Sequence, residues 1–405
     1  MKVLYFHQYF TIPQIGGATR SYEFAKKLIE RGHMVTMVCG GDVSKLNLPK
    51  TDRTRIRRGM IDGINVIQID LPYSNNDSLL KRAITFIKFA YIGNKIAMQE
   101  EYDLLFATST PLTAGIPGIW IKLFGKKKKF IFEVRDLWPE LPKALGLKNP
   151  IFLVGMAVLE KLSYKKADAC VGLSPGICEG IKRIVPDKTI EMIPNGCDLG
   201  IFNPKNRSSI KLEGISPQDT VAIFSGAHGV ANGLDNVLDG AKEVLKTGRD
   251  DIKFVFIGSG KMKKHLMTRV NNENIDNCRF YNPMPKNKLN KIVASADIGI
   301  MALANVPAFY YGTSPNKFFD YISSGLSILN NYPGWLADMI KEYQCGEVVP
   351  PKNPKEFGNA VIKLADNPNL REMYGRNARK LAEQKFARNE LANQFVDFLE
   401  KICKI

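Results

Sequence analysis

Short apolar segments alternate with longer amphipathic segments along most of this 405-residue chain. An apolar run at residues 3–7 is followed by a helical pattern up to about Arg31, and a second apolar run occupies residues 34–39. A strand, a helix and a further strand in this order are the usual start of a parallel α/β domain. The pattern therefore predicts the α/β fold class, with doubly wound, Rossmann-like sheets.

The same alternation continues after residue 79, behind one insertion. Residues 55–59 and 61–71 alternate apolar and polar positions around Asp62 and Gly63, which predicts a hairpin. Long helices are expected at 79–98, 111–124 and 151–166. Further strands are expected at 103–108, 129–134, 169–173, 190–193, 221–225, 253–257, 278–281, 297–301 and 326–329.

The pattern breaks between residues 199 and 217, where the chain becomes polar and contains Pro, Gly and Ser. Linkers have this composition, so we expect domains at 1–200 and 201–386. Three helical segments close the chain, at about 353–366, 368–384 and 388–404. The length allows each domain its own core.

Composition excludes several classes of protein. The seven cysteines are scattered without a C-x-x-C pair, which argues against a disulfide framework or zinc site and fits a reducing cytosol. No apolar run reaches the ~20 residues of a membrane-spanning helix. The first residues enter a strand directly, so no signal peptide is expected.

The net charge of +17 suits an anionic partner: a nucleotide diphosphate, nucleic acid or an acidic membrane surface. Residues 79–129 hold nine basic residues against three acidic ones, interleaved with aromatic and aliphatic side chains. Such a segment is attracted to anionic bilayers, and the alternative is a pair of core helices with a solvated lysine loop. Nucleic acid is disfavoured, because no recognised binding motif accompanies the charge.

Residues 312–325, GTSPNKFFDYISSG, predict a loop that turns into a helix. Ser314 is expected to cap this helix, with Pro315 at its first position. The first-turn amides then suit an anion, and Lys317 adds a full charge. Asp320 could accept two hydrogen bonds from a diol; the alternative is a surface ion pair with Lys317.

Two segments of the first half carry candidate ligand-binding residues. Gly16 and Gly17 follow the first strand, where a doubly wound fold binds ligands, although the pattern alone favours a plain turn. Arg20 lies one turn further on. Arg135 and Asp136, in EVRDLWPE, follow another predicted strand and suit acceptor binding or proton acceptance. The alternative is an Arg–Asp pair that closes a loop.

Two glycine-containing turns of the second half follow predicted strands. Gly226 and His228 lie in SGAHGVANGLD, and a lone histidine is more often structural than catalytic. Gly258 and Gly260 lie in IGSGKMKK, but the third glycine of a dinucleotide fingerprint is absent.

Together these segments resemble the retaining glycosyltransferases of family 4, which have the GT-B fold. In that family two glutamates seven residues apart flank the nucleotide-binding loop; Asp320 falls on the second, and Gly312 on the first. The family's diphosphate-binding lysine falls on Asn232, and the arginine region offers only Ala227 and His228. The form SPNKFFDY resembles a bacterial subgroup that builds surface polysaccharides with N-acetylated amino sugars, such as N-acetyl-fucosamine.

The resemblance implies two Rossmann-like domains facing across a cleft, with residues 387–405 packing back on the first domain. It implies transfer of an N-acetylated hexosamine from a UDP-sugar to an undecaprenyl-diphosphate-linked saccharide, with retention and without a cofactor or metal. The expected place is the cytoplasmic face of a bacterial plasma membrane, in O-antigen, capsule or lipopolysaccharide synthesis. A UDP-sugar epimerase of the same fold and an inactive, membrane-docked component remain alternatives.

The resemblance also assigns roles to individual residues. Lys317 stabilises the leaving diphosphate and Asp136 receives the proton of the acceptor hydroxyl, as the catalytic pair. Acceptor binding is assigned to Arg20, Arg135 and Asp136. The donor-binding set is Gly16, Gly17, Gly226, His228, Gly258, Gly260, Ser314, Pro315, Asn316, Lys317 and Asp320.

Overall fold

The computed structural model describes residues 1–404 except 16, 50–54, 75–76, 125–127 and 209–211. The chain forms two compact units: Met1–Pro194 together with Asn389–Ile405, and Asn195–Arg388. The division lies a few residues before the expected position at 200, because Asn195 is already hydrogen-bonded to Ser314 of the second unit.

The first unit contains one eight-stranded sheet in the order β3-β4-β2-β1-β5-β6-β7-β8. Every neighbouring pair is parallel except β3 and β4, which form the expected antiparallel hairpin. The strands are β1 (Lys2–Phe6), β2 (Met34–Gly41), β3 (Ile56–Ile61), β4 (Ile64–Asp70), β5 (Leu104–Thr108), β6 (Lys129–Val134), β7 (Ala169–Gly172) and β8 (Thr189–Met192).

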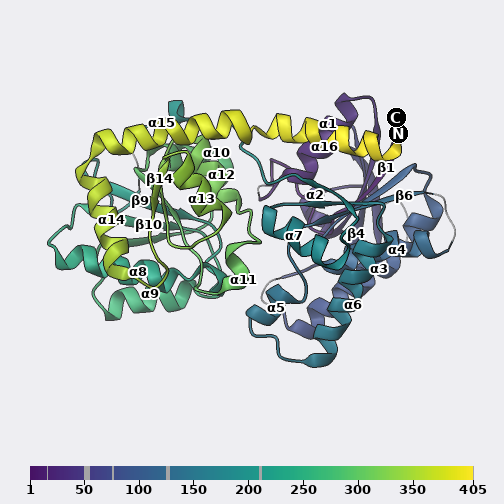
Figure 1. Cartoon of the computed structure of the whole chain (residues 1–405), viewed down its shortest axis with the longest axis horizontal. Helices are drawn as coiled ribbons and strands as arrows, with labels where there is room; N and C mark the ends of the chain where they lie inside the picture. Colours follow the sequence, from purple (N-terminus) through teal and green to yellow (C-terminus); the bar gives the residue numbers. More distant parts are fainter. Residues whose placement is uncertain (16, 50–54, 75–76, 125–127, 209–211, 405) are drawn as a thin grey trace. The chain divides into compact units, whose positions relative to one another are not determined.

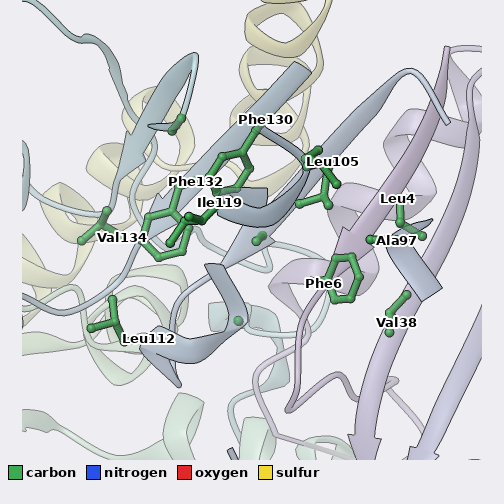
Figure 2. Packing of buried hydrophobic residues seen from close by; sticks show 14 of the residues in the cluster. Leu4, Phe6, Val38, Ala97, Leu105, Leu112, Ile119, Phe130, Phe132 and Val134 are labelled. Atoms are coloured by element: carbon green, nitrogen blue, oxygen red, sulfur yellow. The ribbon is translucent and has the colours of Figure 1, made fainter. Parts of the chain in front are cut away.

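Helices cover both faces of this sheet. One face carries α3 (Leu79–Gln99), α4 (Ile116–Leu123), α6 (Pro150–Lys166) and α7 (Pro175–Ile184). Figure 2 shows the core beneath them, where Phe130 and Phe132 of β6 lie around Ile119 of α4. Each such buried side chain contributes about 1.5–3 kcal/mol relative to an exposed one. The two remaining helices of this part are short, α2 (Val43–Leu46) and α5 (Glu140–Ala144).

The opposite face is covered by α1 (Arg20–Glu30) and α16 (Arg388–Cys403), the last helix of the chain. Phe395 of α16 stacks on Phe24 with ring centroids 4.3 Å apart and meets Phe106 edge-on at 5.0 Å. The end of the chain thus completes the first core, as predicted.

The second unit contains a six-stranded, fully parallel sheet in the order β11-β10-β9-β12-β13-β14. Its strands are β9 (Thr220–Ser225), β10 (Ile252–Ile257), β11 (Cys278–Tyr281), β12 (Ile298–Met301), β13 (Ser327–Asn330) and β14 (Gly346–Val348). The sequence did not predict β14, because three residues with a glycine give no apolar run. Gly346 is needed there, since a Cβ would lie 2.0 Å from the carbonyl oxygen of Ile328.

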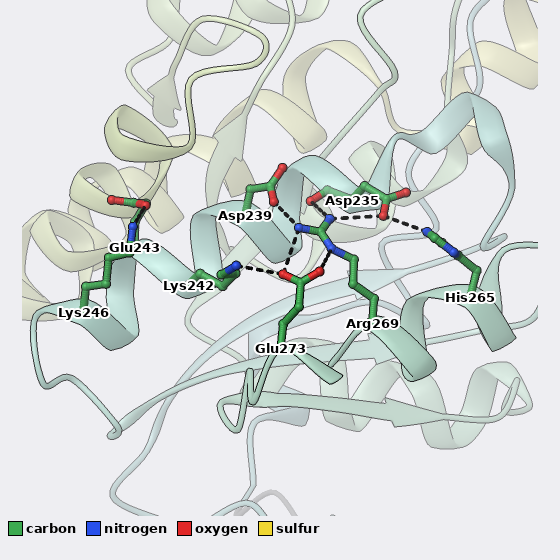
Figure 3. Close-up of polar contacts among 8 residues, drawn as sticks. All are labelled: Asp235, Asp239, Lys242, Glu243, Lys246, His265, Arg269 and Glu273. Carbon is green, nitrogen blue, oxygen red and sulfur yellow. Dashed lines mark hydrogen bonds and ion pairs between the residues drawn. The ribbon is translucent and has the colours of Figure 1, made fainter. Parts of the chain in front are cut away.

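Eight helices are described around this sheet: α8 (Leu234–Lys246), α9 (Lys263–Asn272), α10 (Lys286–Ser295), α11 (Pro307–Tyr310), α12 (Asn316–Ser323), α13 (Trp335–Glu342), α14 (Pro354–Asp366) and α15 (Pro368–Lys385). Surface ion pairs join α8 to α9 (Figure 3): Arg269 binds Asp235, Asp239 and Glu273, and Lys242 also binds Glu273.

Both sheets have a point where the strand order reverses, between β1 and β5 and between β9 and β12. Open α/β sheets bind ligands at the carboxyl ends of their strands at such points. The candidate residues after β5, β6, β9 and β12 therefore lie where each sheet is suited to bind a ligand. None of the described helices is both long and apolar enough to cross a bilayer.

Candidate functional site

The start of α12 is open, and Ser314 does not cap it. The Ser314 hydroxyl accepts a hydrogen bond from the Asn195 backbone N–H at 3.0 Å, and its carbonyl accepts one from the Asn195 amide at 2.6 Å. Pro315 occupies the cap position instead of the first helical position, so no side chain caps the helix. The prediction of a serine cap was wrong because Asn195 competes for that hydroxyl. The amides of Asn316 and Lys317 therefore have no intrahelical acceptor and are suited to an anion.

Lys317 is a cation held without a counter-ion. Its Nζ donates to Asn232 Oδ1 at 2.8 Å and lies 4.0 Å from the centroid of the Phe224 ring. The Asn232 amide in turn donates to the Ala227 carbonyl at 2.7 Å, which fixes its oxygen toward the lysine. Among the described residues no carboxylate pairs with Lys317, and burial lowers its pKa to about 7. The expected alternative, a surface ion pair with Asp320, is not formed.

Asp320 lies one turn further along α12. Burial raises the pKa of its carboxyl to about 6, and the charges of Lys286 and Arg388 oppose the rise. Asp198 lies 4.0 Å from Lys286 and 3.9 Å from Arg388, so it shares these cations with Asp320. At neutral pH Asp320 is therefore an anion that can accept hydrogen bonds.

Three glycines let the turns after β9 and β10 pack against each other. A Cβ on Gly258 would lie 1.8 Å from the Gly226 carbonyl oxygen, and one on Gly260 would lie 2.4 Å from the His228 carbonyl oxygen. A Cβ on Gly226 would lie 3.2 Å from Cε of Lys317. Close packing between the two turns accounts for Gly258 and Gly260, and Lys317 lies against Gly226. The contact of these glycines with a donor stays a prediction.

His228 is buried behind these turns, not facing solvent. Its ring lies among Phe224, Phe256 and Phe280, with centroids 5.8–6.4 Å away. Neither ring nitrogen has a hydrogen-bond partner within the described part of the chain. Burial, followed by the charges of Lys263 and Lys317, lowers its pKa to about 4. The imidazole is therefore neutral at physiological pH and adds no charge to the site.

In the first unit, Asp136 is held by the segment that follows β5. Thr110 Oγ1 donates to Asp136 Oδ2 at 2.9 Å, and the Arg135 N–H donates to Ser109 Oγ at 2.9 Å. Burial raises the pKa of Asp136. Arg135 and Asp136 form no ion pair with each other. Sequence reasoning missed Ser109 and Thr110, although hydroxyls directly after a buried strand are a usable signal.

Arg20 makes structural contacts, which argue against its predicted role in acceptor or phosphate binding. Its guanidinium is buried and donates twice to Glu133 Oε1, at 3.0 and 2.8 Å. It also donates to the carbonyl oxygens of Ile193 and Pro194. The cation is thus neutralised and its donors are committed to the end of the sheet. Gly17 has a φ of +90°, a region that favours glycine, and Gly16 lies outside the described residues.

Two doubly wound units, one with an uncapped helix start and a lysine at its strand reversal, have the architecture of the GT-B fold. The chain is a glycosyltransferase: residues 16–196 match the family model "Glycosyl transferase 4-like domain", and residues 206–381 match "Glycosyl transferases group 1".

Known proteins similar to this chain cover nearly all of it. An uncharacterized glycosyltransferase of Methanocaldococcus jannaschii is 23% identical over 408 residues, 99% of each chain. Sucrose-phosphate synthase of Thermosynechococcus elongatus has a TM-score of 0.78 at 15% identity, over 99% of this chain and 98% of the other. HepE of Anabaena, solved in complex with UDP, has a TM-score of 0.71 at 14% identity, over 99% and 100%.

Proposed function

We propose that this glycosyltransferase moves an N-acetylated hexosamine, or its deoxy relative, from a UDP-sugar to a lipid-linked saccharide in bacterial surface-polysaccharide synthesis. The observation that carries the donor half is Lys317, a half-buried cation without a carboxylate partner among the described residues, beside the open start of α12. A lysine deprived of solvent is stabilised by an arriving anion, and a diphosphate supplies one.

We assign the donor's nucleotide from the neighbouring groups and from a protein of the same fold. Asp320, ionised above pH 6, suits the two ribose hydroxyls. HepE, a protein with the same fold, binds UDP, which favours a uridine nucleotide over a guanosine nucleotide. The N-acetylated sugar rests on the SPNKFFDY resemblance.

During transfer the acceptor oxygen forms a bond to the anomeric carbon while the bond from that carbon to the diphosphate breaks. Lys317 and the amides of Asn316 and Lys317 stabilise the charge that develops on the leaving diphosphate. Asp136, with its pKa raised by burial, takes the proton of the acceptor hydroxyl. We propose that these groups act without a metal ion, so activity should persist in EDTA.

The outer faces of α3, α4 and α6 support a membrane-bound acceptor. These helices pack side by side on one face of the first sheet. Exposed apolar side chains follow their solvent faces: Leu79, Leu80, Ile84, Ile87, Tyr91, Trp120, Leu123, Phe124, Ile151, Phe152, Val154, Val158 and Leu162. Exposed lysines lie among them, at 81, 88, 95, 161 and 165. Lys126 and Lys127 of the predicted basic loop lie outside the described residues.

Apolar side chains with surrounding lysines suit the surface of an anionic bilayer, because the side chains insert shallowly and each lysine adds about 1 kcal/mol. The sequence prediction stopped at residue 129, and α6 extends it. Ile151, 81% exposed, is the most open of these side chains.

Thermal stability with added nucleotides tests the donor site. A uridine ligand at about 100 times its dissociation constant should add about 2.7 kcal/mol to the free energy of unfolding. The shift should appear with UDP and UDP-N-acetyl sugars, fail with GDP, and vanish in Asp320→Ala. Asp276→Ala, an exposed carboxylate of the same unit, is the matched control. The absence of any shift in the wild type would refute the proposed donor.

A further inference from the structure

The residues that follow β6 form a segment, 135–139, that is fixed from two sides. At its start, Ser109 and Thr110 bind the Arg135 N–H and the Asp136 carboxylate. Near its end, the Trp138 backbone N–H donates to Glu160 Oε1 at 2.8 Å. Asp136 lies between these two attachments.

Glu160 belongs to the buried side of α6, the helix whose outer side is apolar and exposed. Its side chain is 5% exposed, and the same oxygen also accepts the Tyr164 hydroxyl at 2.7 Å. No cation pairs with it among the described residues. Arg183 affects Glu160 only through long-range electrostatics, and its guanidinium lies 3.7 Å from the carboxylate of Glu140.

A buried carboxylate without a cation is unfavourable, and an apolar residue on a core helix avoids that cost. The same burial raises the pKa of the Glu160 carboxyl. The two hydrogen bonds offset part of the cost, and one of them goes to the segment that carries Asp136. Packing alone would not call for a carboxylate here.

We propose that Glu160 is a positioning residue: through Trp138 N–H it holds segment 135–139, and so Asp136, where the acceptor hydroxyl must arrive. The inference rests on the proposed role of Asp136. Without Glu160 the Trp138 N–H loses its acceptor and the segment can shift. A displacement of about 1 Å at a reacting group can lower a rate by up to ~100-fold.

Three variants separate this role from simple packing. Glu160→Leu introduces an apolar side chain of similar size and removes the acceptor. Glu160→Gln keeps an oxygen for Trp138. Glu140→Gln, on an exposed carboxylate next to the segment, is the control. If Glu160→Leu does not fold by circular dichroism, Glu160→Met, which also removes the acceptor, takes its place.

The kinetic readout compares transfer to the lipid-linked saccharide with hydrolysis of the UDP-sugar by water. Glu160→Leu should lower kcat for transfer about tenfold while hydrolysis and the donor KM change less than twofold. Glu160→Gln should recover most of the transfer rate. Equal losses of transfer and hydrolysis, or no loss, would overturn the inference, because packing damage acts on both.

A second readout does not depend on the acceptor. In a Trp120→Phe/Trp335→Phe background Trp138 is the remaining tryptophan, and acrylamide quenching reports its exposure. Quenching should rise in Glu160→Leu and stay unchanged in Glu160→Gln and Glu140→Gln. Unchanged quenching in Glu160→Leu overturns the inference. If quenching increases in Glu160→Leu but the wild-type enzyme transfers to no lipid-linked saccharide, Glu160 still positions segment 135–139. That result would refute the proposed function and leave the inference standing.

Discussion

Raising the pH from 7 to 8.5 should weaken donor binding, because it removes the proton that the diphosphate needs on Lys317. Burial lowers the pKa of this lysine to about 7, so in the free enzyme the Lys317 side chain is half protonated at pH 7 and largely neutral above pH 8. A bound diphosphate favours the charged form. The dissociation constant should then rise about fivefold between pH 7 and 8, and the slope approaches tenfold, or about 1.4 kcal/mol, per unit at higher pH.

At low pH donor binding should weaken as well, so that affinity there rises with pH instead of falling. The pKa of Asp320 is raised to about 6, so the carboxylate that accepts the ribose hydroxyls becomes protonated below that value. Affinity should fall about fivefold between pH 6 and 5. Binding is therefore strongest between about pH 6 and 7, with both limbs set by burial.

Calorimetric titration with a UDP-sugar between pH 5 and 8.5 measures both limbs. A UDP-sugar is preferable to UDP, because its diphosphate has no terminal phosphate that titrates in this range. Lys317→Arg, which stays protonated, should lose the upper limb, and Asp320→Asn should lose the lower one. A dissociation constant that stays flat from pH 6 to 8.5 would refute the reasoning, since Lys317 would then titrate like an exposed lysine.

Three further predictions follow from other contacts. Lys317→Met should raise the free energy of unfolding of the unliganded enzyme by about 2 kcal/mol at pH 7, measured by urea denaturation. Because the folded state lowers the pKa of Lys317, wild-type stability rises between pH 7 and 10, and the stability gain of Lys317→Met should shrink over that range. An equal gain at pH 7 and pH 10 would contradict the lowered pKa of Lys317. Arg20→Met should cost about 3–5 kcal/mol of stability by leaving Glu133 unpaired, while the acceptor KM of the folded fraction stays constant; a raised KM at unchanged stability would restore the acceptor role. Val154→Glu/Val158→Glu should reduce sedimentation with phosphatidylglycerol vesicles about tenfold or more, with Met267→Glu on α9 as the control, and equal binding by all three proteins would refute membrane contact through α6.

Local pattern predicted the elements well, because each strand or helix depends mainly on its own residues. The limits of α14 and α15 lie within about a residue of expectation. The strand β14 was not predicted, because a three-residue edge strand has almost no periodic signal.

The site was harder to predict than the fold, because its residues are defined by distant partners. Ser314 has the sequence signature of a cap, yet Asn195, 119 residues away, takes its hydroxyl. Asn232 was seen as a lost lysine, but it orients Lys317. Arg20 was placed near a ligand by its distance from Gly17, whereas Glu133 of β6 pairs with it. Spacing along the chain identified which segments matter and could not supply these pairings.

The position of α16 has a consequence for biosynthesis. Phe395, which covers Phe24 and Phe106, lies about four hundred residues into the chain, after the whole second unit. A ribosome must therefore make that unit before the first sheet can cover its second face. During this delay the aromatic residues on β5 and α1 remain accessible to chaperones, and a product interrupted before residue 389 would leave this surface exposed for proteolysis.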